Sequence, residues 1–158
     1  MSETVKVKPL KLDTLLAVLR GSVGTKMFQH FYASVDGKKT DIMQNGDLSC
    51  AFFVSSVLAM MGLLDRAHGT VLGTVKMMEK SGWLKTRVLK PGVVLVWDYK
   101  IGGGGEKHQH IGFYLGENMA ISNSDLKKVP IIHPVNFGSL NSKQYRKIVG
   151  IYKHDELK

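Results

Sequence analysis

The stretch Asp47-Leu-Ser-Cys-Ala-Phe-Phe-Val-Ser-Ser-Val-Leu-Ala-Met-Met-Gly62 decides the fold of this chain. Asp47 or Ser49 can cap the start of a helix and Gly62 can end it, while almost every residue between them is apolar or small and none is charged. A helix without a polar face has to be surrounded by protein. The run is too short to cross about 30 Å of hydrocarbon, so it predicts a buried central helix and no membrane span.

Further elements are predicted outward from this helix. Residues 14–20 and 71–80 have apolar side chains at helical spacing, and the turn formers in 34–46 favour an exposed loop. Beyond residue 82 the period changes to that of strands, which we expect at 83–88, 93–97, 110–115, 119–123 and 148–152. Helices followed by consecutive strands predict an α+β fold in which the N-terminal helices and the buried central helix pack on an antiparallel sheet.

The length of 158 residues predicts a single domain over 1–158, with 1–12 as a basic, loosely ordered arm. The chain holds 22 Lys and Arg against 13 Asp and Glu, a net charge of +9, which favours contact with an anion, whether nucleic acid, a membrane surface or an anionic cell-wall polymer. Nucleic acid is the less favoured partner, because no basic stripe is interleaved with aromatic residues. Charges interrupt the N-terminus where a secretory signal needs an apolar run, which favours the cytoplasm unless another export or lysis route applies.

Cys50 is the only cysteine, so neither an internal disulfide nor a cysteine-rich zinc site can form. A lone cysteine in an apolar run is usually an inert core residue. Its place in the first turn of the central helix is unusual, because the helix dipole there stabilises a thiolate and can lower the thiol pKa. The polar residues before it indicate that this helix tip meets solvent. Cys50 is therefore a candidate nucleophile.

A cysteine nucleophile needs a base. His110 begins an alternating strand and shares one face with Gly112, which leaves room for another element to approach. His108 lies on the same face but adjoins Gly102–Gly105, a run that we interpret as a flap rather than a nucleotide loop. The base needs an orienting group, which the next strand supplies. Asn123 is the favoured candidate and Ser122 the alternative, because the hairpin register decides which of them faces His110.

Three motifs resemble those of the NlpC-type cell-wall cysteine peptidases, which are related to the CHAP amidases. Cys50-Ala-Phe-Phe-Val54 resembles their cysteine signature, Lys90-Pro-Gly-Val-Val-Leu-Val-Trp97 a strand signature, and His110-Ile-Gly-Phe-Tyr-Leu-Gly116 the strand with the catalytic histidine. They occur in the family's order over about residues 44–124. The resemblance implies a papain-like fold with Cys50 as nucleophile and His110 as base. Leu48 and Ser49 stand where the family usually has Tyr and Asp.

These observations together predict a cysteine hydrolase, a peptidase or amidase that cleaves peptide or amide bonds. The resemblance implies peptidoglycan-type peptides as substrates. The expected site is Cys50, His110 and Asn123, with no metal or organic cofactor. The alternative is a catalytically inactive relative that binds a cell-wall or other anionic polymer through its basic surface.

Overall fold

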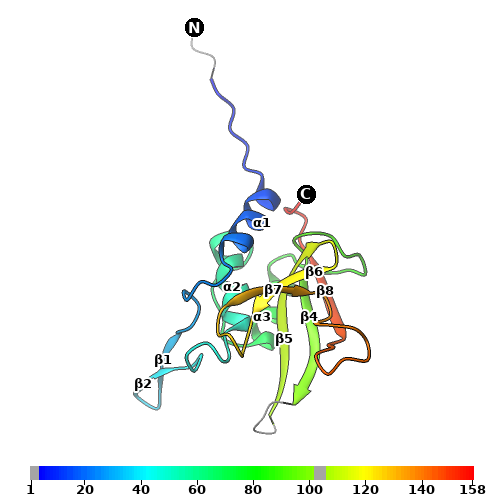
Figure 1. Cartoon of the computed structure of the whole chain (residues 1–158). Helices are drawn as coiled ribbons and strands as arrows, with labels where there is room; N and C mark the ends of the chain where they lie inside the picture. Colours follow the sequence, from blue (N-terminus) through cyan, green and yellow to red (C-terminus); the bar gives the residue numbers. More distant parts are fainter. Residues whose placement is uncertain (1–3, 102–105) are drawn as a thin grey trace.

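The computed structural model describes residues 4–101 and 106–158, so the predicted flap at Gly102–Gly105 lies outside the described residues. The described residues form three helices and eight strands (Figure 1). In chain order the elements are α1 (Lys11–Gly21), β1 (Tyr32–Val35), β2 (Lys38–Asp41), α2 (Cys50–Met60), α3 (Val71–Lys80), β3 (Leu84–Lys85), β4 (Val94–Ile101), β5 (Lys107–Gly116), β6 (Met119–Asn123), β7 (Pro130–Pro134) and β8 (Ile148–Lys153).

Six strands form one sheet in the order β3-β8-β4-β5-β6-β7, and its neighbouring strands run antiparallel. The strands β1 and β2 form a separate hairpin at one end of the molecule (Figure 1). The helices lie on one side of the sheet, with α2 against β5 and β6. The predicted α+β fold is confirmed.

The central helix is buried as its composition requires. Phe53, Val54 and Leu58 of α2 are completely buried, and they share one core cluster with Ile111 and Phe113 of β5. Burial of each such side chain stabilises the fold by roughly 1.5–3 kcal/mol. This packing fixes the N-terminal end of α2, where Cys50 lies, against the sheet.

A second, smaller cluster covers the other face of the sheet around Trp97. The buried residues Leu95, Trp97 and Tyr114 belong to it, and Phe137 packs against its edge. The indole of Trp97 is anchored because its Nε1 donates to the carbonyl oxygen of Val135 at 2.8 Å. Alternation along β5 therefore directs odd-numbered side chains to the helices and even-numbered ones, including His110, toward this second cluster.

The turn between β5 and β6 sets which residue faces His110. Glu117 and Asn118 have φ values of 51° and 58°, the left-handed pair that a tight type I′ hairpin turn requires. A bulge between Tyr114 and Gly116 then shifts the register, so that Phe113 pairs with Ile121. A two-residue turn with a bulge thus gives the register of a three-residue loop, and Ser122 rather than Asn123 lies on the His110 face.

Several sequence-based expectations were wrong in detail. Residues 34–46 are not one loop, because the β1–β2 hairpin occupies much of that segment. The strand expected at 83–88 is reduced to the two residues of β3. Strand β7 was not predicted, because its two prolines and a histidine disguise its alternation. Strand β7 matters most, since it brings His133 to the site.

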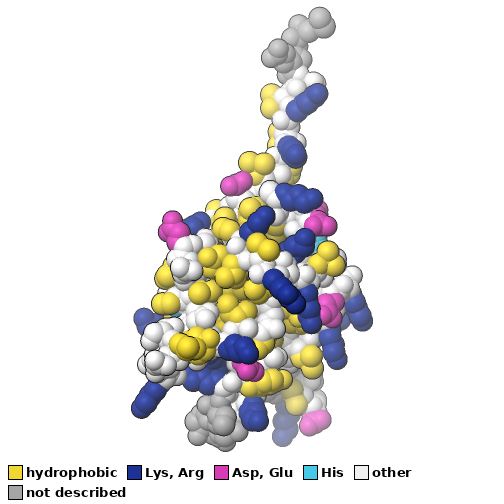
Figure 2. All heavy atoms as spheres, turned by 90° about the vertical axis from the view of Figure 1, so that its right-hand side faces the viewer, with side chains coloured by type: hydrophobic (Ala, Val, Ile, Leu, Met, Phe, Trp, Pro, Cys, Tyr) yellow, Lys and Arg dark blue, Asp and Glu magenta, His cyan; other side chains and the backbone are white. Residues whose placement is uncertain are grey.

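The surface reflects the positive net charge. Figure 2 shows a face on which Lys and Arg side chains surround a central hydrophobic area and outnumber the acidic ones. The described part of the N-terminal arm extends away from the body in Figure 1, and its Val5 and Val7 are exposed. Among the helices of the described residues, none combines the length and the apolar character needed to span a bilayer.

Candidate active site

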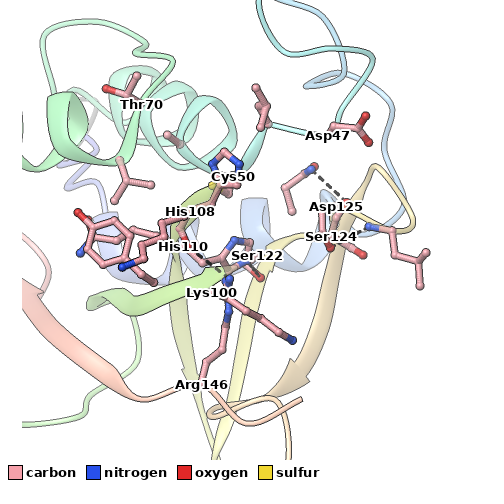
Figure 3. Close-up of a pocket in the computed structure, with 18 of the residues that line it drawn as sticks. Asp47, Cys50, Thr70, Lys100, His108, His110, Ser122, Ser124, Asp125 and Arg146 are labelled. Atoms are coloured by element: carbon pink, nitrogen blue, oxygen red, sulfur yellow. Dashed lines mark hydrogen bonds between the residues drawn. The ribbon is translucent and has the colours of Figure 1, made fainter. Parts of the chain in front are cut away.

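A cavity of about 750 Å³ opens where α2, α3 and the sheet meet. This size is within the usual range for small-molecule and peptide-binding pockets. Figure 3 shows its labelled residues converging from several elements. The wall includes side chains from the starts of α2 and α3, from β4, β5 and β6, and from the segment before β8: Cys50, Leu72, Lys100, His108, His110, Ser122, Asn123, Phe137 and Arg146.

Cys50 is the first residue of α2, as predicted, and it is half-buried at the pocket. The pKa of its thiol is shifted in the opposite direction to the expectation. Desolvation by burial raises its pKa above the ordinary value, although the backbone N–H groups of Ile111 and Ala51 and the charge of Arg146 oppose the rise. Because the thiol interacts with the amide of Ile111, it lies beside the peptide unit that joins His110 to Ile111. The resting form is therefore a neutral thiol.

The loop before Cys50 is held by hydrogen bonds from its own backbone. Asp41 accepts from the backbone N–H groups of Phe31, Met43 and Asn45 and pairs with His30 at 2.8 Å. Although desolvation opposes it, the His30 bond and these backbone bonds hold the pKa of Asp41 well below its usual range. Asp41 is thus ionised and fixes the turn that leads into α2.

Gly46 completes this loop at a place where other residues would not fit. Its φ is +95°, and an added Cβ would lie 2.8 Å from the Cβ of Lys128 and 2.9 Å from its carbonyl oxygen. The carbonyl of Gly46 also accepts from Nδ2 of Asn123 at 3.1 Å. The loop before Cys50 is consequently packed directly on the β6–β7 connection.

His110 lines the same pocket from β5. Burial, the positive charge of Arg146 and, least, the electrostatic influence of the nearby His133 ring lower its pKa well below the ordinary histidine value, so the ring is neutral at neutral pH. The described hydrogen bonds include none between the thiol of Cys50 and this ring, so the pair shares a cavity without a direct bond in the resting state. Catalytic hydrogen bonds are often long in unliganded enzymes and shorten when substrate binds.

A chain of hydrogen bonds leads from His110 to the backbone of β7. Nε2 of His110 lies 2.8 Å from Oγ of Ser122, and this Oγ lies 2.7 Å from Nε2 of His133. Nδ1 of His133 lies 2.8 Å from the carbonyl oxygen of Pro134. Four residues from three adjacent strands are therefore connected in series.

The Pro134 carbonyl determines which atom donates the hydrogen in each bond of this chain. The carbonyl of Pro134 can only accept, so Nδ1 of His133 carries a hydrogen, and burial lowers the pKa of His133 so that the ring is neutral. Its Nε2 then accepts the hydroxyl hydrogen of Ser122, and the Ser122 oxygen accepts from Nε2–H of His110. We assign the tautomers on this basis. Nδ1 of His110 is left with a lone pair, as a general base requires.

Close packing holds the chain in place. His133 is buried and stacks on Phe137 with ring centroids 3.9 Å apart, and Phe137 meets the edge of His110 at 5.5 Å. Gly112 allows β6 to approach, because an added Cβ would clash with the carbonyl of Ile121 and lie 2.8 Å from the Cβ of Ser122. The prediction that Gly112 leaves room for a neighbouring element is confirmed.

The prediction that Asn123 orients His110 is wrong. Alternation along β6 turns Asn123 away from the imidazole, and its Nδ2 donates to the carbonyls of Gly46 and Ser124 instead. Ser122, the alternative, makes the contact. Asn123 still lines the pocket and is buried, and its Oδ1 has no hydrogen-bond partner among the described residues.

Two site residues were missed by the sequence analysis. His133 was interpreted as structural, and its signal would have been the alternation of 130–134 if this strand had been recognised. Arg146 was interpreted as part of a solvated basic face, but it lines the pocket and its charge lowers the pKa of both Cys50 and His110. No local pattern identifies Arg146, because it lies in an irregular segment.

The described residues contain no group of three or more His, Cys, Asp or Glu side chains arranged to hold a metal ion. No protein-family model matches the chain, and no curated protein sequence is significantly similar to it.

Proposed function

We propose that this protein is a cysteine hydrolase of papain-like fold that cleaves peptide or amide bonds. The observation that supports this most strongly is the directed hydrogen-bond chain, which leaves Nδ1 of His110 as a free base in the pocket that also holds the thiol of Cys50. A buried histidine with a purely structural role does not require a fixed tautomer that faces a cavity beside a cysteine.

The proposed reaction begins with both groups neutral. When a substrate amide enters, Nδ1 of His110 takes the thiol proton and the sulfur attacks the carbonyl carbon. The N–H groups in the first turn of α2 stabilise the developing oxyanion. The imidazolium of His110 then donates its proton to the leaving amine nitrogen, and water hydrolyses the resulting thioester to regenerate the thiol.

The hydrogen-bond chain supports the charged intermediate. When His110 is an imidazolium, its Nε2–H donates more strongly to Ser122, which passes the polarisation to His133 through the second bond. No carboxylate takes part, so the chain orients the base without making the resting imidazole more basic. This agrees with the low pKa of His110.

The substrate class implied by the motifs is peptidoglycan-type peptides. The decisive experiment is a digest of peptidoglycan and of small γ-linked peptides, analysed by mass spectrometry, with Cys50→Ala as the control. Cleavage that Cys50→Ala abolishes is expected. Absence of cleavage by the wild-type protein in every substrate tested would contradict the hydrolase proposal.

The second candidate is an inactive relative that binds an anionic polymer. The observations that favour it are the neutral thiol, the missing Tyr and Asp before Cys50, and the basic face in Figure 2. Salt-sensitive binding to peptidoglycan or to an anionic cell-wall polymer that survives Cys50→Ser, without any amide cleavage, would select this alternative.

A further inference from the structure

One charged group in the pocket has no role in the reaction described above. Nε of Arg146 is buried and has no hydrogen-bond partner, and its Nη2 makes only a long bond of 3.5 Å to the carbonyl oxygen of His108. A guanidinium has five N–H donors, so most of this capacity is unused. Among the described carboxylates, none lies within the 4.0 Å of an ion pair with Arg146.

The charges around the cavity leave this part of it positive. Lys100 of β4 and Lys107 of β5 also line the pocket. Asp47 is on the opposite side and already pairs with Lys128 at 3.0 Å. Asp125 also lines the pocket, and its charge acts to raise the pKa of Arg146, but the two groups are not within the 4.0 Å of an ion pair. A carboxylate is the ligand that a guanidinium binds best, because its two oxygens match two parallel N–H groups.

The position of Arg146 indicates which half of a substrate it meets. His110 donates its proton to the leaving amine, so the leaving half lies on the imidazole side of the thiol. Arg146 is on that side, because it bonds to the carbonyl of His108 and its guanidinium carbon lies 5.9 Å from the centroid of Phe137, the ring that contacts His110. In an amino acid, the carboxylate carbon is about 2.5 Å from the amine nitrogen.

We propose that Arg146 binds the free C-terminal carboxylate of a peptide, so that the enzyme releases the last amino acid of its substrate. This inference rests on the proposed hydrolase function and adds the substrate class. Cys50 forms a thioester with the new C-terminal residue, the C–N bond breaks, and the released amino acid takes the proton from His110. Water then splits the thioester into a carboxylic acid and the thiol, without oxidation or reduction.

A binding experiment tests the inference without requiring turnover. Cys50 is alkylated with iodoacetate and with iodoacetamide, two reagents of similar size of which only the first is anionic. The ratio of the two rates cancels any change in thiolate fraction. We expect a ratio about tenfold above that of a free thiol, which Arg146→Gln returns close to the free-thiol value. The matched control Arg66→Gln removes the same charge from an exposed site and leaves the ratio unchanged.

Peptide protection then identifies the ligand. A panel of acetyl-dipeptides that differ in their last residue is added to the iodoacetamide reaction, each as the free acid and as the C-terminal amide. We expect acids to slow the alkylation of wild-type protein more than amides, and Arg146→Gln to remove this difference. Equal protection by acids and amides, protection by neither, or an unchanged difference in Arg146→Gln would overturn the inference.

Cleavage assays distinguish a failure of the carboxylate-binding inference from a failure of the proposed hydrolase function. Release of the terminal residue from acids, with amides cleaved at least tenfold more slowly, is the expected result. Equal cleavage of acids and amides, or a requirement for a carboxylate on the acyl side of the scissile bond, would overturn the C-terminal assignment and keep the hydrolase. Protection by acids without any cleavage would instead overturn the hydrolase and keep the carboxylate site.

Discussion

The two walls of the pocket are built on different principles. On the wall formed by β5, β6 and β7, side chains fix one another through two hydrogen bonds, and aromatic rings hold them on both sides. On the wall at the start of α2, the position of Cys50 is fixed by the helix and by the loop before it, which the carboxylate of Asp41 and the carbonyl of Gly46 hold in place. No side chain of the described residues forms a hydrogen bond with the thiol. In the proposed reaction the base is therefore oriented before substrate arrives, whereas the proposed nucleophile is still a neutral thiol.

This difference predicts that substitutions on the wall formed by β5, β6 and β7 reduce catalysis most. We expect His110→Ala to lower kcat/KM for amide cleavage about 10³-fold, or about 4 kcal/mol, because general base catalysis contributes 10²–10⁴-fold. His154→Ala removes a histidine that does not line the pocket and bonds to the carbonyl of Ser81, and it serves as the control. Steady-state assays of both variants make the comparison, and equal losses in both would show that the assigned base is wrong.

A smaller effect is expected when the direction of the hydrogen-bond chain is lost. In His133→Leu the Ser122 hydroxyl can rotate and donate to Nε2 of His110, which places the ring hydrogen on Nδ1 and removes the base. We expect kcat to fall about thirtyfold, or about 2 kcal/mol, with KM little changed.

The pH profile distinguishes this positioning role from a purely structural one. Because burial lowers the pKa values of both His110 and His133, the acid limb of wild-type activity should lie below the ordinary histidine value of about 6.5. Ser122→Thr keeps the hydroxyl and should keep most of kcat, whereas Ser122→Ala should lower kcat and leave the acid limb in place, because burial and the neighbouring charges, not the Ser122 bond, lower the pKa of His110. An acid limb at or above 6.5 in wild type, or an unchanged kcat in Ser122→Ala, contradicts the chain.

The sequence analysis singled out Cys50 and His110, which line one pocket, but did not identify the residues that surround His110. Cys50 and His110 were found because a capped apolar helix and an alternating strand with a glycine are local patterns. The choice between Ser122 and Asn123 depended on a bulge at residues 114–116, which no composition rule gives. His133 depended on recognising a strand that begins and ends with proline, and Arg146 on how an irregular segment folds over the sheet.

The pKa of Cys50 illustrates a second reason why the sequence-based expectation and the structure disagree. From sequence, the helix dipole was expected to lower the pKa of Cys50, and backbone N–H groups do act in that direction. Burial opposes them and prevails. Since desolvation depends on how completely the surrounding chain covers the sulfur, no inspection of neighbouring residues in the sequence could weigh the two effects.

Substitutions in the loop before α2 should mainly lower the free energy of unfolding of the protein. Asp41→Asn removes a charged acceptor of several backbone hydrogen bonds, and we expect a loss of about 1 kcal/mol in the free energy of unfolding at pH 7. Because the folded pKa of Asp41 is lowered, its contribution is complete above the unfolded pKa near 4 and is lost as the pH falls toward the folded value.

Urea unfolding at several pH values measures this contribution. The difference between wild type and Asp41→Asn should shrink as the pH falls below about pH 4. The exposed Asp65→Asn, which removes a carboxylate with only a 3.6 Å contact to Arg66, is the control and should change little. A difference that does not shrink below about pH 4 would mean that Asp41 does not hold the loop as an anion.

The smallest expected effect is on the pKa of the Cys50 thiol. This pKa measures the electrostatic interaction between Arg146 and Cys50 across the pocket. Arg146 lowers the pKa of Cys50 across the pocket, against the larger effect of burial. The pH at which iodoacetamide labelling reaches half its maximal rate should lie above that of a free cysteine in wild type and should rise further in Arg146→Gln. His133→Leu should leave it almost unchanged, since His133 is not among the groups that shift this pKa. An unchanged midpoint in Arg146→Gln would mean that Arg146 and the thiol are electrostatically independent, so that the thiol gains nothing from the charge across the pocket until substrate is bound.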